Sequence, residues 1–410
     1  MRLPQLTAIV FAALILPSCN RERECVYPID PVAPASPWEY DSSAFLHRPS
    51  WIADDADAIR AECKDAANGD WSKWQHQTAA YRAALKAKVL ALENGTGVGA
   101  GGLPLQRTPA RYSALEGLNK FPLFEINPAD SLSHLYDPES LATFRNQRGV
   151  IAAKRWLRRR DIDLIFVPLP AMAEVYVESF VQPCPADGIV APHVRQTLLE
   201  LLAADVETVD AFRLFRTQRG PGPELSYLFN AADRLWAPRA MRIVAREVAG
   251  RIERWHFQTR GPKPRFQTAQ RTYHIHPDKP LAHWEVLAEQ EGWEVLSDEQ
   301  KARATRAQMS AREDVTLEGG IKPADDPRSP VLLIGDSHIF NFREQLIRAL
   351  NMPVNTHWTE SHTTESFHDF VNKPALLVDV RVVVWITTEQ NMTHFEPMDA
   401  SILAELDSDK

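Results

Sequence analysis

A Gly-Asp-Ser triplet at residues 335–337 is the part of this sequence that most clearly offers chemistry. It follows four apolar residues, 331–334, and precedes a stretch with helical periodicity that runs to Leu350. A serine on a sharp strand-to-helix turn is lifted out of a parallel sheet, at the end where α/β proteins bind ligands. That position suits a nucleophile. The alternative is an ordinary turn in which Ser337 only caps the helix.

Two residues before the serine are expected to shape this turn. Gly335 permits the tight backbone approach that such a turn needs, and Asp336 follows it directly. The helix behind the turn presents backbone N–H groups at its N-terminus, where they can hold an oxyanion. The sequence therefore predicts an oxyanion-binding turn at Gly335 and Asp336, directly in front of Ser337.

Strands and helices that alternate along the chain must position this turn. Apolar runs predict strands at 163–170, 206–210, 331–334 and 380–386. Helical periodicity covers 51–93, 139–160, 194–204, 239–253 and the stretch behind Ser337, whereas 254–329 is poorly patterned. This alternation predicts an α/β fold with a parallel sheet sandwiched by helices, preceded by a helical extension.

Composition excludes several classes of function. The chain has 410 residues and a net charge of -8 without a long basic run, so nucleic acid is not an expected partner. It contains no Cys-x-x-Cys or His-Glu-x-x-His pattern, and no metal site or cofactor is predicted. The alternating pair His274 and His276 resembles half of a metal site but lacks a clear third ligand.

The N-terminus has the layout of a secretory signal. Arg2 is followed by an apolar run, 6–16, that is too short for a stable membrane span. The run ends at Leu-Pro-Ser-Cys, which resembles a bacterial lipobox with Cys19 as the lipidated residue; a plain cleaved signal is the alternative. A lipid on Cys19 would anchor the protein on the periplasmic side, and Asn20 weakly favours the outer membrane.

Three further cysteines bear on this compartment. In an oxidising periplasm Cys25 and Cys63 can pair and leave Cys184 free, although sequence does not fix the connectivity.

Several short motifs resemble, in order, the SGNH hydrolase-like domain of the alginate O-acetyltransferases of the AlgX/AlgJ type. The similar region covers roughly residues 110–395, and its fold is flavodoxin-like. The motifs are Val167-Pro168-Leu169-Pro170 with Val175-Tyr176, Val209-Asp210, residues 233–240, Gly335-Asp336-Ser337, and Val383-Val384-Trp385.

The resemblance implies a serine acyltransferase or esterase that takes part in polysaccharide O-acetylation. A serine activated by a histidine, which an aspartate orients, would accept an acetyl group and pass it to a polysaccharide hydroxyl. A membrane protein that donates the acyl group is a possible partner. Carried over to this sequence, Ser337 is the nucleophile and Asp233 the orienting acid, while Trp236 is expected at the substrate cleft.

The family histidine does not carry over, because its position is Leu235. His338 is the adjacent candidate for a replacement base, although neighbouring side chains on a turn usually point apart. Without a base, a serine hydroxyl is a poor nucleophile near neutral pH. The alternative function is therefore a catalytically inactive relative that binds polysaccharide or a partner of an exopolysaccharide modification or export complex.

These features together predict five segments. They are a lipoprotein signal at 1–19, a Pro-rich tether at 20–50, a helical extension at 51–109, the SGNH hydrolase-like domain at 110–395, and a C-terminal tail at 396–410.

Overall fold

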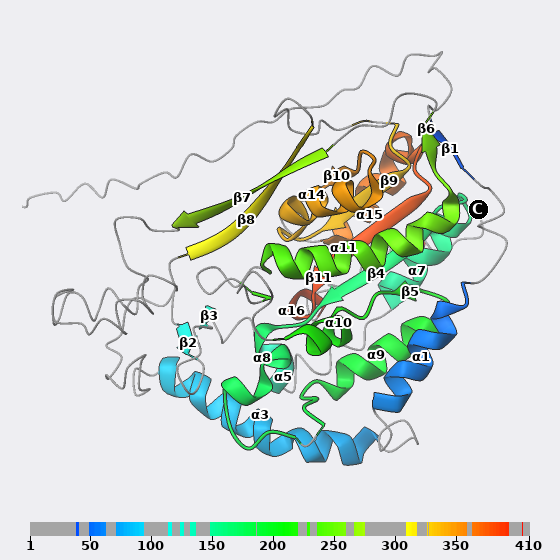
Figure 1. Cartoon of the computed structure of the whole chain (residues 1–410). Coiled ribbons are helices and arrows are strands. Elements are labelled where there is room, and N and C mark those ends of the chain that lie inside the picture. The colour runs from blue at the N-terminus through cyan, green and yellow to red at the C-terminus, as the bar shows by residue number, and fades with distance from the viewer. Residues whose placement is uncertain are drawn as a thin grey trace, which may run out of the picture. The chain divides into compact units, whose positions relative to one another are not determined.

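A computed structural model of the chain describes most of the region after residue 37 (Figure 1). All described residues belong to one compact unit, Pro37–Lys410. They are residues 38–40, 49–62, 71–93, 114–116, 124–126, 132–136, 148–185, 187–219, 228–229, 236–259, 266–274, 309–317, 326, 328–358, 363–392 and 404.

A five-stranded parallel sheet forms the centre of the fold, in the order β10-β9-β11-β4-β5. Its strands are β4 (Asp163–Leu169), β5 (Glu207–Thr208), β9 (Val331–Gly335), β10 (Asn355–His357) and β11 (Val382–Thr388). The three inner strands are buried along almost their whole length. Strands covered on both faces read as continuous apolar runs, which is why the sequence revealed them.

Helices flank this sheet, and the prediction of a helix-sandwiched parallel sheet is confirmed (Figure 1). The longer helices are α7 (Arg148–Arg158), α9 (Pro192–Ala203), α10 (Ala211–Gln218), α11 (Pro238–Ile252), α14 (Ile339–Leu350) and α15 (Thr363–Asn372). One-turn helices are α5 (Ser133–Tyr136), α8 (Met172–Val175) and α16 (Glu389–Met392), with 3₁₀ turns at Val177–Ser179, Glu253–Trp255 and Pro374–Leu377.

The apolar stripes of α11 and α14 explain why these two helices lie side by side (Figure 1). On α11 the spacing of Met241, Val244, Val248 and Ile252 places all four side chains on one buried face, as predicted. On α14 the buried positions include Phe342, Leu346 and Ile347.

The predicted helical stretch at 51–93 corresponds to two helices, α1 (Trp51–Glu62) and α3 (Trp71–Glu93). On α3 the side chains of Tyr81, Leu85 and Val89 are buried in the same core as the sheet. The segment boundaries proposed from sequence remain predictions.

The stretch at 254–329, which the sequence left without a pattern, contains an antiparallel ribbon. Strands β7 (Phe266–His274) and β8 (Met309–Leu317) pair along their whole length, and β8 contacts α14 (Figure 1). Their polar composition lacks the apolar pattern by which a strand is predicted from sequence. Smaller antiparallel pairs join β1 (Trp38–Glu39) to β6 (Gln258–Thr259) and β2 (Ala114–Glu116) to β3 (Phe124–Ile126).

Ion pairs close the amino end of the sheet. Asp163 and Glu207, at the starts of β4 and β5, both bind Arg254, at 2.9 and 2.7 Å. Asp55 of α1 binds Arg251 of α11 at 2.7 Å, and the indole of Trp51 donates to Glu207 at 2.7 Å. These contacts attach α1 to the sheet. None of the described helices is both long and apolar enough to cross a membrane.

Candidate active site

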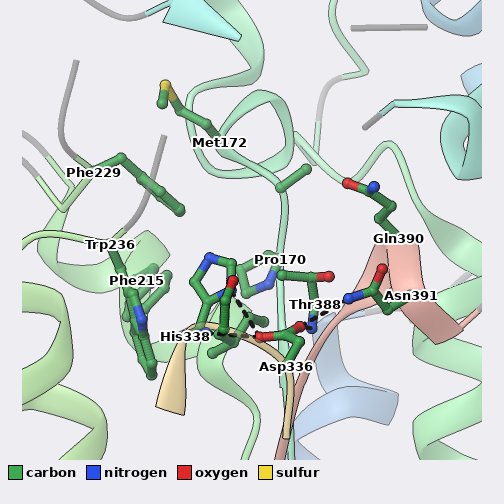
Figure 2. Close-up of a pocket in the computed structure, with 13 residues that line it drawn as sticks. Pro170, Met172, Phe215, Phe229, Trp236, Asp336, His338, Thr388, Gln390 and Asn391 are labelled. Carbon is green, nitrogen blue, oxygen red and sulfur yellow. Dashed lines mark hydrogen bonds and ion pairs between the residues drawn. The ribbon is translucent and has the colours of Figure 1, made fainter. Parts of the chain in front are cut away.

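A pocket of about 190 Å³ lies at the carboxyl end of the sheet (Figure 2). The chain leaves β4 towards β5 on one side and leaves β9 towards β10 on the other, and this divergence opens a crevice in an α/β sheet. Residues directly behind β4, β9 and β11 therefore meet there. The lining comprises Leu169, Pro170, Ala171, Met172, Phe215, Phe229, Trp236, Asp336, Ser337, His338, Thr388, Gln390 and Asn391.

Gly335 ends β9 and begins the turn that carries the polar side of the pocket. A Cβ atom at this position would collide with the backbone carbonyl of Ile386 on the neighbouring strand β11 and with the side chain of Ile339. The Ile386 backbone cannot give way without breaking the sheet, so the position requires glycine. Close strand packing, rather than a ligand, is what fixes this residue.

Asp336 is held by donors on three sides. Its Oδ1 accepts the backbone N–H of His338 at 3.0 Å and lies 2.8 Å from the His338 Nδ1; its Oδ2 accepts the Thr388 N–H at 2.8 Å and the Asn391 amide at 2.9 Å. Burial raises the pKa of Asp336, but the His338 ring and the backbone N–H groups outweigh it and lower the pKa to about 2. Asp336 is therefore a carboxylate at neutral pH.

His338 takes its orientation from this carboxylate. An ionised Asp336 accepts hydrogen bonds only, so the His338 Nδ1 carries a proton, and in the neutral ring the lone pair is then on Nε2. The imidazole lines the pocket beside Trp236, with 6.4 Å between the ring centroids (Figure 2). This is the tautomer that a general base requires.

Ser337 lies between these two residues, in the pocket lining, and is exposed. The N-terminal cap of α14 is His338, so the alternative in which Ser337 caps the helix is wrong. Among the described residues, no hydrogen bond joins the Ser337 hydroxyl to His338. Such contacts are often long in unliganded enzymes and tighten when substrate binds.

Aromatic side chains form the opposite wall. Trp236 stacks on Phe342 of α14, with ring centroids 5.2 Å apart and planes 7° apart, and Phe215 of α10 meets its edge. Trp236 reaches the pocket, as expected, but it is only 1% exposed. Its ring is therefore packed into the pocket wall and offers no open aromatic face on which a sugar could stack.

The other residues predicted for the site are Asp233, Leu235 and Cys19, and all three lie outside the described residues. Phe229 and Trp236, which flank the first two in sequence, pair with each other as an isolated β-bridge and line the pocket.

Sequence reasoning missed the contribution of β11. Thr388 and Asn391, which bind Asp336, follow this strand directly. The signal was available, because residues behind the carboxyl end of one parallel strand lie next to those behind its neighbour. The predicted strand stopped at Ile386, two residues before its actual end.

Comparisons with known proteins agree with this architecture. Residues 133–389 match the family model described as "SGNH hydrolase-like domain, acetyltransferase AlgX". The O-acetyltransferase domain of Pseudomonas putida AlgJ is 18% identical, with a TM-score of 0.50, and the match covers 72% of this chain and 98% of that one.

Two further solved structures are more remote. Pseudomonas aeruginosa AlgX is 15% identical with a TM-score of 0.43, covering 72% of this chain and 67% of that one. Bacillus cereus PatB1 is 11% identical with a TM-score of 0.39, covering 68% and 97%. No curated protein matched the chain.

Proposed function

Because the chain belongs to the family of the SGNH hydrolase-like domain of the acetyltransferase AlgX, we propose that it is a serine acyltransferase of polysaccharide O-acetylation. The observation that carries this proposal is the hydrogen bond between Asp336 and His338, which gives an exposed serine a correctly protonated neighbouring imidazole. The membrane acyl donor and the polysaccharide acceptor are part of the same proposal.

In this mechanism Ser337 is the nucleophile and His338 the base. The His338 Nε2 takes the hydroxyl proton as the Ser337 oxygen attacks the acyl carbonyl, and it returns the proton to the leaving oxygen when the donor bond breaks. The acyl-serine is then attacked by a polysaccharide hydroxyl, whose proton passes to His338 and back to Ser337. Asp336 stabilises the imidazolium at both stages.

The turn residues would stabilise the oxyanion. Backbone N–H groups of the turn behind Gly335 remain our proposal for this role. The side chain of Asp336 cannot serve, because its carboxylate is negatively charged and only accepts hydrogen bonds, as it does from His338, Thr388 and Asn391. Asp233, the orienting acid in the family pattern, remains proposed as a second acid.

The size of the pocket favours a small acyl group over a whole sugar as the buried portion of the substrate. About 190 Å³ is smaller than the roughly 300–1,000 Å³ of pockets that enclose drug-sized ligands. The wall formed by Met172, Phe215 and Phe229 would contact the acyl methyl group. The polysaccharide then lies outside, where only its reacting hydroxyl reaches Ser337.

The test is turnover of a generic acetyl ester by the purified chain and by its Ser337→Ala variant, with mass spectrometry of the acetylated protein. We expect turnover and an acetyl group on the Ser337 peptide, both lost in the variant. Ser329→Ala is the matched control, because Ser329 lies two residues before the same strand and its hydroxyl donates to the carbonyl of Pro353 instead of facing the pocket. Equal activity of wild type and Ser337→Ala would contradict the proposal.

A second candidate function is a catalytically inactive polysaccharide-binding relative. It is favoured by Leu235, which replaces the family histidine, and by the Ser337 hydroxyl, which makes no hydrogen bond to His338 in the part of the chain that the structure describes. Absence of any serine acetylation, together with polysaccharide affinity that Ser337→Ala leaves unchanged, would establish this function. Restored turnover in Leu235→His would instead show a site that has lost only its base.

The proposed location is the periplasmic side of a bacterial membrane, with a lipid on Cys19. It is supported by the lipobox-like sequence that ends at this residue. Cys19→Ser should release the protein from the membrane fraction, and continued membrane association would exclude the lipid anchor.

A further inference from the structure

Three buried ligand groups converge behind the pocket. They are His134 of α5, Glu174 of α8 and Glu389 of α16, none more than 2% exposed. One ligand atom from each lies within 4.8 Å of the others, and the His134 Nε2 is 3.2 Å from Glu174. Because the ligands come from three distant segments, no sequence motif marks the cluster.

Glu389 shows that the cluster is incomplete as it stands. Neither of its carboxylate oxygens meets a nitrogen or hydroxyl donor in the described parts of the chain, and the polar group that it faces is the carboxyl group of Glu174. A buried carboxylate without donors or a cation is strongly unfavourable. Asp336, which lies at the carboxyl end of the same sheet, accepts four hydrogen bonds.

The charges around the cluster are compatible with a bound cation. The buried guanidinium of Arg195 acts on Glu389, but it is bound to Asp210 at 2.6 Å and is neutralised by it. With a metal ion bound, Glu174 and Glu389 would both be ionised and carry two negative charges, and a neutral His134 would add none. A divalent cation would make the whole buried assembly neutral.

We propose that His134, Glu174 and Glu389 form a binding site for a divalent transition-metal ion of the Zn²⁺ type. An imidazole nitrogen with two carboxylate oxygens is a donor set that suits zinc, whereas Ca²⁺ and Mg²⁺ prefer oxygen ligands alone. A tetrahedral ion with bonds of about 2.1 Å holds its ligand atoms about 3.4 Å apart. Closing the cluster onto the ion therefore requires side-chain movements of about 1 Å.

The metal would act structurally, by joining three one-turn helices. Helices this short are not stable alone, so cross-linking fixes their positions. Glu389 lies between Thr388 and Gln390, which line the pocket, and Glu174 follows Met172 on the opposite side. The ion would thus brace the pocket wall, without contacting substrate.

The test uses the full untagged chain with its thiols alkylated and its metals removed by a chelator. Titration with Zn²⁺ against a colorimetric indicator should give one equivalent bound. The melting temperature should rise by roughly 5 °C when free Zn²⁺ is 100-fold above Kd, and less with Ca²⁺ or Mg²⁺. These readouts do not depend on ester turnover, so they remain informative whether or not the proposed function holds.

Glu389→Gln is the deciding variant, since it keeps the size of the side chain and removes the charge. It should lose both the bound equivalent and the thermal response. Glu207→Gln is the matched control, because Glu207 is an equally buried glutamate bound to Arg254; it should keep both. A wild-type chain that binds no Zn²⁺, or a Glu389→Gln chain that binds one equivalent, would overturn the site. If Glu389→Gln fails to fold, the wild-type stoichiometry decides.

Discussion

The two ends of the central sheet use charged residues in opposite ways. At the amino end, Asp163 and Glu207 face Arg254, a permanently charged and fully committed partner. At the carboxyl end, Asp336 faces His338, whose second ring nitrogen remains available to the pocket. Arginine stays protonated near neutral pH, whereas histidine can gain and lose a proton there. The ion pairs of the amino end therefore suit stability, and in the proposed mechanism the carboxyl end serves proton transfer.

Burial alone does not explain the difference. Both ends of the sheet contain carboxylates with little exposure, and at both ends the hydrogen-bond and ion-pair partners keep these carboxylates charged. What distinguishes the carboxyl end is that its donors are mostly backbone and amide N–H groups, which fix Asp336 without neutralising it. The charge of Asp336 thus remains available to stabilise an imidazolium.

Removing the base should have the largest effect. We expect His338→Asn to lower ester turnover by about 10³–10⁴-fold, because the hydroxyl of Ser337 then has no proton acceptor. Asp336→Asn should cost a similar factor, since an amide can favour the wrong tautomer of the ring. The measurement is steady-state turnover of an acetyl ester.

The control for this prediction is His357→Asn. His357 bonds to Asp369 at 3.1 Å, so it is a second His–Asp pair, but it does not line the pocket. Its replacement should leave turnover unchanged. Equal losses in both variants would mean that the effect comes from folding.

Breaking the amino-end network should lower stability without affecting chemistry. Arg254→Ala leaves the buried Glu207 with only a longer ion pair to Arg251, at 3.9 Å, and the Trp51 hydrogen bond, which should cost about 3 kcal/mol of unfolding free energy. Arg60→Ala provides a surface comparison, because the Arg60–Asp57 pair is exposed and should contribute at most about 1 kcal/mol. Both free energies are measured by denaturant unfolding. Turnover per folded molecule is the second measurement. A large fall in this turnover for Arg254→Ala would contradict the division between the two ends of the sheet.

The pH dependence of stability should be the smallest effect. The pKa of Asp336 falls from an ordinary 3.8 to about 2 on folding, which corresponds to about 2 kcal/mol. A depressed pKa stabilises the folded state above the unfolded pKa, so this contribution is complete above about pH 5 and disappears as pH falls through 2. The difference in unfolding free energy between wild type and Asp336→Asn should therefore shrink between pH 5 and pH 2. A constant difference would mean that Asp336 is not specifically held as a carboxylate.

The candidate site was only partly predictable. Ser337, His338 and Trp236 were predicted from sequence and do line one pocket. The bond between Asp336 and His338 was not predicted, because the family resemblance pointed to Asp233 as the orienting acid. The sequence did not predict roles for Asn391 and Glu389, because a single polar residue behind a strand forms no recognisable motif.

The sequence by itself determined the parallel α/β fold and four of the five strands of its central sheet. Continuous apolar runs such as 331–334 indicate strands that are buried on both faces of a parallel sheet. Tertiary structure alone decided which polar groups meet. His134, Glu174 and Glu389 are far apart in the chain, and only the packing of α5, α8 and α16 brings them within 4.8 Å. Apolar burial is non-directional and can be read from composition, whereas hydrogen bonds and metal contacts depend on positions that only the folded chain fixes.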